Sequence, residues 1–193
     1  MKKYKLYWLL VGLYAVAPLT SVYAADNSAV VKFSADIATG TCTLTADPSV
    51  ALGTVDASTL VGNNWHLANT KKFTLTLSHC TGIGGGELRP TITMTGTPLP
   101  ISGWTNVFKD GGTSKGFGVM VFDADPGEHN SGGIANGGDI YLTDYGKGKT
   151  LPATGTTRDL WAVVACGPTA SCADTNLLPG SLTASLTFAF AYK

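Results

Sequence analysis

The stretch Gly180-Ser-Leu-Thr-Ala-Ser-Leu-Thr-Phe-Ala-Phe-Ala-Tyr-Lys193 decides the fold class, because larger apolar side chains alternate along it with polar or small ones. Successive side chains of an extended chain point to opposite faces, so a period of two is typical of a half-buried strand. The sequence therefore predicts that this stretch is a β-strand with one apolar face. That face carries Leu182, Ala184, Leu186, Phe188, Phe190 and Tyr192.

The same alternation recurs upstream in shorter stretches, for example in Phe73, Leu75 and Leu77. Clusters such as Gly84-Gly-Gly86 and Asp110-Gly-Gly112 lie between these stretches and indicate turns and loops. We find no helical period of useful length. About seven short strands separated by such turn clusters predict an all-β fold, a β-sandwich. Besides the last strand, the predicted strands lie within 30–46, 71–80, 91–96, 117–122, 140–142 and 160–165.

The first residues are typical of a secretory signal and not of the fold. Three lysines precede an apolar run from Leu6 to Ala17, and Val22-Tyr23-Ala24 fits a cleavage site after Ala24. The mature chain would then hold 169 residues, enough for one domain. It would carry 10 basic and 13 acidic residues, a net charge of −3, with no basic stripe. This charge makes nucleic acid and anionic membranes poor candidate partners.

The four cysteines, Cys42, Cys80, Cys166 and Cys172, all follow the predicted signal, so they would reach a compartment where disulfides form. Four cysteines allow three pairings, and the residues alone do not choose among them. Their spacings do not match paired Cys-x-x-Cys zinc knuckles. We therefore expect two disulfides and no metal.

No catalytic pattern stands out, so we expect a protein that is not an enzyme and needs no cofactor. Gly148-Lys149-Thr150 lacks the upstream glycine of a phosphate-binding loop, because Thr143 stands in its place. Asp123 and Asp125 lack the further ligands of a calcium loop and are interpreted as turn residues. Packing is the simplest role for Trp65, Trp104 and Trp161, and a surface or strand position for His66, His79 and His129.

Two motifs carry a resemblance to a known family. In Val31-Lys-Phe-Ser-Ala-Asp-Ile-Ala-Thr-Gly-Thr-Cys42 an aromatic residue is followed at fixed spacings by small and apolar residues and a cysteine. The alternating C-terminal strand has a penultimate tyrosine, Tyr192, and begins after Gly180. Together with the signal and Cys80, these motifs span the chain. In their order and spacing they resemble the type 1-like fimbrial subunits, the pilins of chaperone–usher fibres.

The resemblance implies an incomplete immunoglobulin-like β-sandwich that is completed by a donated strand. It implies a signal peptide at 1–24, an N-terminal donor-strand arm at 25–32 and a pilin domain at 33–193. It pairs Cys42 with Cys80, and Cys166 with Cys172 would then close a loop before the last strand. The donor side chains would be Ala29, Val31 and Phe33. Those of the acceptor groove or chaperone-binding strand would be Leu182, Leu186, Phe188, Phe190 and Tyr192, with the carboxylate of Lys193 held by the chaperone.

The function implied is that of a structural subunit of a bacterial fimbria that supports cell adhesion. Its partners would be other pilin subunits, a periplasmic chaperone, an outer-membrane usher and, for some subunits, a host receptor. The chain would be exported through the periplasm to the surface fimbrium. The alternative is a minor or single-domain adhesive subunit that binds a host receptor. The arm departs from the family pattern, since it is short and has Ser28 and Ala29 where a glycine is usual.

Overall fold

The structure, a computed structural model, describes residue 34 and residues 40–193. Seven strands and two short 3-10 turns, Ala57–Thr59 and Asp174–Asn176, make up the regular structure of these residues. No helix in the described part of the chain is long and apolar enough to span a membrane. The all-β prediction is confirmed. The strands are β1 (Thr43–Ala46), β2 (Ala68–Ser78), β3 (Pro90–Gly96), β4 (Gly118–Phe122), β5 (Gly138–Tyr141), β6 (Thr156–Ala165) and β7 (Leu186–Tyr192).

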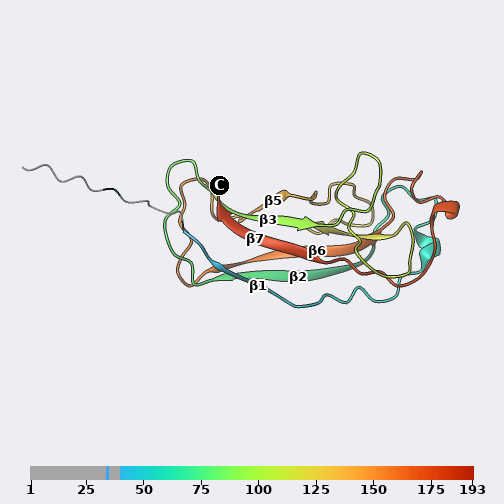
Figure 1. Ribbon diagram of the computed structural model, residues 1–193, viewed down its shortest axis with the longest axis horizontal. Helices are drawn as coiled ribbons and strands as arrows, with labels where there is room; N and C mark the ends of the chain where they lie inside the picture. Colours follow the sequence, from blue (N-terminus) through green and yellow to red (C-terminus); the bar gives the residue numbers. More distant parts are fainter. Residues whose placement is uncertain (1–33, 35–39) are drawn as a thin grey trace, which may run out of the picture. The chain divides into compact units, whose positions relative to one another are not determined.

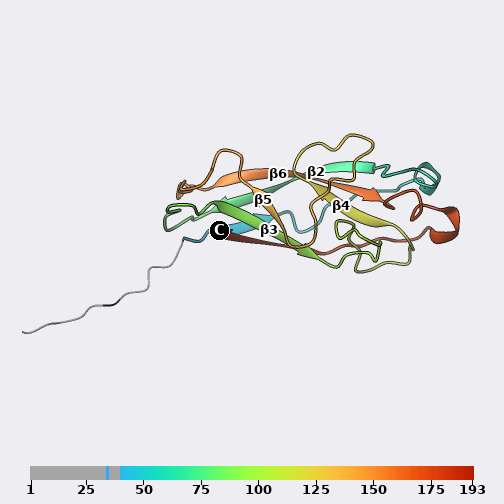
Figure 2. The same ribbon diagram turned by 90° about the horizontal axis from the view of Figure 1, so that it is seen from above.

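The strands form two antiparallel sheets, one of four strands in the order β1-β2-β6-β4 and one of three in the order β5-β3-β7. Figure 2 shows β2 and β6 in one layer and β3 in the other. In Figure 1 the last strand, drawn in red, lies beside the green strand β3. The predicted sandwich is therefore present, with the C-terminal strand at one edge of the smaller sheet.

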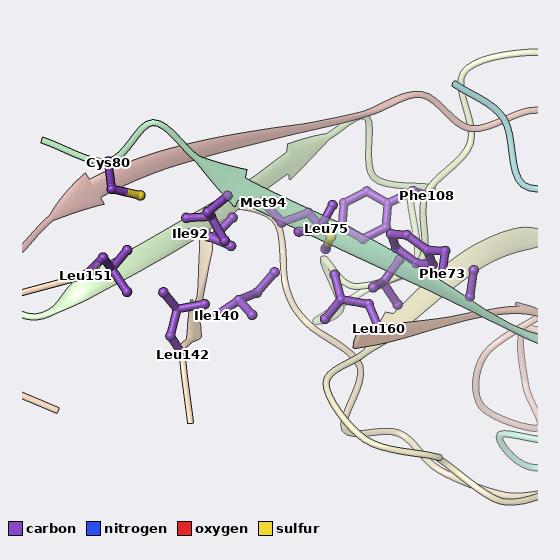
Figure 3. Packing of buried hydrophobic residues seen from close by; sticks show 13 residues of the cluster. Phe73, Leu75, Cys80, Ile92, Met94, Phe108, Ile140, Leu142, Leu151 and Leu160 are labelled. Atoms are coloured by element: carbon purple, nitrogen blue, oxygen red, sulfur yellow. The ribbon is translucent and has the colours of Figure 1, made fainter. Parts of the chain in front are cut away.

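The main core fills the space between the two sheets (Figure 3). Leu75 and Leu160 of the larger sheet and Ile92 and Met94 of the smaller sheet are fully buried there. They are the alternate residues of their strands, so the period of two in the sequence marks the buried faces. Phe108, from the loop between β3 and β4, is also fully buried in this cluster.

A second apolar cluster covers the opposite face of the larger sheet. Met120 and Phe122 of β4 and Val163 of β6 belong to it, and they alternate with residues of the main core such as Val121. Loop residues, among them Trp65, pack on this face. Both faces of β4 and of residues 160–165 in β6 are therefore apolar, which is why these stretches are nearly continuous hydrophobic runs in the sequence.

Both disulfides are formed. The bond between Cys42 and Cys80 links residues 38 positions apart and ties the start of β1 to the end of β2. This pairing is confirmed. Cys166 and Cys172 are also bonded, are both fully buried, and close a short loop after β6.

The last strand begins later than the alternation predicts. Residues 182–185 keep the alternating burial, but β7 starts at Leu186. The stretch before it pairs instead with the loop after Asp110, through isolated bridges of Gly111 with Thr183 and of Lys115 with Leu178. The alternation of apolar residues indicates which side chains face the core. It does not indicate which segment the backbone forms hydrogen bonds with.

Candidate functional site

Within residues 40–193, the last strand pairs with another strand along one edge only. Every residue of β7 from Leu186 to Tyr192 is in register with β3, from Gly96 to Pro90. On its other side, no strand among residues 40–193 pairs with β7. β1 is likewise at an edge of the larger sheet, and it lies near β7. The sandwich is thus open along the side where these two edge strands face each other.

A groove of about 860 Å³ lies along this open side, and we call it the edge groove. One wall is the segment 46–55, which begins at the last residue of β1, and the other is the segment 179–186, which ends at the first residue of β7. The floor comes from the inner face of the larger sheet. Its apolar residues are Phe73 of β2, Val119 and Val121 of β4, and Ala162 and Val164 of β6, together with Phe117 just before β4.

The first wall is held by the side chain of Asn69. Its Nδ2 donates hydrogen bonds to the carbonyl oxygens of Leu52 and Thr54, both at 2.8 Å. Asn69 lies at the irregularity between Ala68 and Lys71 of β2 and has a φ of 52°. Asparagine tolerates this left-handed conformation better than most residues. The bulge therefore directs an amide toward a segment that has no strand partner of its own.

The second wall is held by the loop after β3. The Asp110 carboxylate accepts a hydrogen bond of 2.8 Å from the backbone N–H of Ser185. Hydrogen bonding from Ser185 lowers the pKa of Asp110 below its usual value. At Gly112, whose φ is 92°, an added Cβ would lie 2.2 Å from the carbonyl oxygen of Ser181. The wall approaches this loop so closely that only glycine fits there.

Three of the five predicted groove residues line the edge groove: Leu182, Leu186 and Phe188. All three are half-buried, and the ring of Phe188 lies 6.1 Å from that of Phe73 on the floor. Phe190 and Tyr192 lie farther along β7 and do not line the groove. Their rings form an edge-on pair with centroids 5.4 Å apart.

Tyr192 is a buried anchor of the last strand. It is 6 % exposed, and its hydroxyl accepts a hydrogen bond of 3.0 Å from the backbone N–H of Leu151. Gly84 makes room for the ring, because a Cβ at that position would lie 2.9 Å from it. The penultimate tyrosine thus joins β7 to the loop before β6.

The last residue, Lys193, is bound within the domain. Its Nζ donates to Asp139 at 2.7 Å and to Thr93 at 2.6 Å. The lysine lowers the pKa of the Asp139 carboxyl, aided by a hydrogen bond from Thr93. The backbone of Lys193 also exchanges two hydrogen bonds with Arg89. The end of β7 is therefore well fixed.

The donor side chains that the resemblance implies, Ala29, Val31 and Phe33, lie outside the described residues, as do the predicted signal and arm. The edge groove wall at 46–55 was not predicted at all. This segment has no alternating pattern and contains Pro48 and Gly53. Its apolar residues Val50, Leu52 and Val55 are half-buried against the domain, a contact that no pattern in the sequence indicates.

The turn aspartate, the tryptophans and the histidines that the sequence analysis discusses do not line the edge groove. Asp125 accepts a hydrogen bond from the N–H of Gly127, as a turn residue does. Trp65 is buried, and its ring meets that of Trp104 edge-on at 4.4 Å. Within residues 40–193, the ring of His79 contacts one side-chain hydrogen-bonding group, the hydroxyl of its neighbour Ser78 at 3.3 Å. His66 and His129 were placed in separate segments by sequence, but the structure brings them together.

Comparison with known proteins supports the architecture. No family model and no curated protein matches the chain. Among solved structures, the P pilus rod subunit PapA is similar, with a TM-score of 0.51 and 17% identity over 79% of this chain and 99% of that one. A chaperone–usher pilus is also similar, with a TM-score of 0.51 and 18% identity over 89% of this chain and 99% of that one.

These similarities define a class of fold. The chain has the incomplete immunoglobulin-like fold of chaperone–usher pilus subunits. Both similar structures match this chain over most of its length.

Proposed function

We propose that this protein is a structural subunit of a bacterial surface fibre, assembled by the chaperone–usher route through donor-strand exchange. The observation that carries the proposal is the edge groove, an apolar channel beside the unpaired edge of β7. The shared fold with pilus rod subunits supports the same interpretation.

The physical reason is that such an edge is stable only when it is covered. Unpaired backbone groups next to apolar side chains invite another chain to add as a strand. A strand laid in the groove would bond to the backbone of β7 and place alternate side chains on the floor between Phe73 and Val164. The occupant would be the arm of a neighbouring subunit in the fibre and, before assembly, a strand of the periplasmic chaperone.

The proposed roles depend on position along β7 and the segment that leads into it. Leu182, Leu186 and Phe188 would contact the side chains of the donated strand, because they line the groove. Phe190 and Tyr192 would serve chaperone capture or the anchoring of β7 itself. In the donor arm, Ala29, Val31 and Phe33 would alternate into the groove of the next subunit. The usher would catalyse the exchange, and the subunit would reach the cell surface as part of the fimbrium.

The test is to complete the sandwich with a peptide. The mature, oxidised chain would be refolded alone and with a peptide copying residues 25–36, and its thermal stability recorded. We expect a large rise in melting temperature with the peptide, because it would pair with the edge of β7 and cover half-buried apolar side chains of the groove lining, such as Leu186 and Phe188. The matched control is the same peptide with Val31 and Phe33 replaced by aspartate, which should give no rise.

A contrary result would be equally clear. An empty groove should make the chain unstable alone or prone to associate. A chain that folds as a stable monomer, stays monomeric at high concentration and binds neither this peptide nor the arms of neighbouring subunits would have a complete domain. That outcome would refute the proposal.

A further inference from the structure

Two histidines far apart in the sequence face each other on the surface. His66 precedes β2, and His129 follows the turn after β4. Nδ1 of His66 and Nε2 of His129 are 3.3 Å apart, and the ring centroids are 4.7 Å apart with an interplanar angle of 58°. His129 is exposed and His66 half-buried, so solvent reaches the pair. The proposed fibre function does not use them.

The backbone explains why these rings meet. His66 and His129 form an isolated antiparallel bridge. The hydrogen bonds on either side of it run from Leu67 N–H to the Glu128 carbonyl, at 2.8 Å, and from Asn130 N–H to the Trp65 carbonyl, at 3.1 Å. The two histidines are therefore a non-hydrogen-bonded pair, the arrangement in which opposite side chains come closest. Because Trp65 and Leu67 are buried, the position of His66 between them is fixed.

A third contact orients one of the rings. Nδ1 of His129 lies 3.2 Å from the backbone carbonyl oxygen of Asn64. A carbonyl only accepts, so Nδ1 of His129 carries the proton and Nε2 presents its lone pair toward His66. Metal-binding histidines are commonly held in this way, with one ring nitrogen donating to a backbone carbonyl and the other free to ligate.

The spacing of the two nitrogens suits a metal ion. Zinc–nitrogen bonds are about 2.0–2.1 Å long, so two of them spanning this separation would meet at an angle of roughly 105–110°, close to tetrahedral. We propose that His66 and His129 bind one divalent transition metal ion of the zinc class. His66 would ligate through Nδ1, with its proton moved to Nε2 or released.

The site would be open. No group of three or more metal-ligating side chains gathers elsewhere within residues 40–193, nor does a third one join this pair. Water or a donor from another molecule would fill the remaining positions. A bound ion would join the segment before β2 to the loop after β4, two segments 63 positions apart in the chain.

The chain offers a matched set of variants, because it has three histidines and all its described cysteines are in disulfides. The oxidised mature protein, with the peptide if needed for folding, would be titrated with Zn²⁺ by calorimetry and with Co²⁺ by visible absorption. We expect one ion per chain, a tetrahedral Co²⁺ spectrum and a higher melting temperature with Zn²⁺. His66→Ala and His129→Ala should each weaken binding by more than about tenfold, and His79→Ala should not.

His129→Ala carries the test even if His66→Ala fails to fold, because the ring of His129 is exposed. Absence of stoichiometric Zn²⁺ binding in the wild type would overturn the proposal. So would binding that survives His129→Ala unchanged, or that is lost equally in His79→Ala. None of these outcomes bears on the edge groove, so the fibre proposal is tested separately.

Discussion

At the scale of single residues, Tyr192 shows that a sequence motif can identify the strand of a residue without identifying its hydrogen-bond partner. The alternation put it on the same face as Phe188, and the structure confirms that both face inward. Only Phe188 reaches the edge groove, because Tyr192 lies beyond its end with its hydroxyl bonded to Leu151. The partner of that hydroxyl lies 41 positions away, so no local pattern could have indicated it.

Replacing Tyr192 by phenylalanine tests this anchor. The change leaves the buried N–H of Leu151 without its acceptor, which should cost about 1–3 kcal/mol of unfolding free energy. Urea denaturation of the peptide-completed protein would measure it. Tyr141→Phe is the control, because Tyr141 is 47% exposed and its ring, which lies 4.0 Å from the Arg89 guanidinium, is kept. Equal stability of the two variants would mean that the hydroxyl of Tyr192 does not anchor the strand.

The pair of His66 and His129 is a contact between distant residues that the sequence alone did not predict. The sequence predicts a surface or strand position for each of His66 and His129, which lie in separate segments. They meet through one antiparallel bridge between loops. A single bridge is too short to produce an alternating pattern in the sequence, so it could not be predicted. The position of a side chain opposite another depends on register, which is a property of the folded chain.

At the scale of elements, the strands were predictable and their pairing was not. Predicted stretches at 71–80, 91–96 and 117–122 match β2, β3 and β4 closely. These strands each bury one or both faces, and a buried face requires apolar residues at regular positions that can be recognised in the sequence. The wall at 46–55 could not be predicted, because it is held by Asn69 and by backbone carbonyls and not by an apolar stripe.

The two disulfides close loops of very different length, and their contributions to stability should differ accordingly. Separations of 38 and 6 positions predict roughly 4 and roughly 2 kcal/mol on the loop-entropy model. Replacing both Cys42 and Cys80 by alanine should therefore destabilise the domain more than replacing Cys166 and Cys172. Both double variants remove the same atoms, so each serves as the control for the other.

Chemical denaturation of the two double variants, each completed with the peptide, is the measurement. A larger loss from the Cys166 and Cys172 variant would show that burial of that pair outweighs loop closure. The Cys166–Cys172 disulfide would then stabilise the fold more than the Cys42–Cys80 disulfide, contrary to expectation.

At the scale of the whole molecule, the open side of the sandwich should govern assembly. Replacing Phe188 by aspartate puts a charge on the groove lining, where a donated strand would bury it without a partner. We expect the affinity for the peptide to fall by more than about a hundredfold, or roughly 2.7 kcal/mol. Thr187→Asp, on the exposed face of the same strand, should bind nearly as well as the wild type.

Fluorescence titration with labelled peptide, after circular dichroism has shown that both variants fold, would compare them. Equal affinity for the two variants would place the peptide somewhere other than the edge groove.

The apolar lining of the edge groove has a further consequence, which concerns temperature. Covering its half-buried residues, such as Leu182, Leu186 and Phe188, takes hydrocarbon surface out of water, and this gives association a negative change in heat capacity. The enthalpy of joining two subunits would then become more favourable with warming while the entropy becomes less so. Contacts of this kind lose strength on cooling, so the cohesion of a fibre built through this groove would have an optimum temperature and would decline toward the cold.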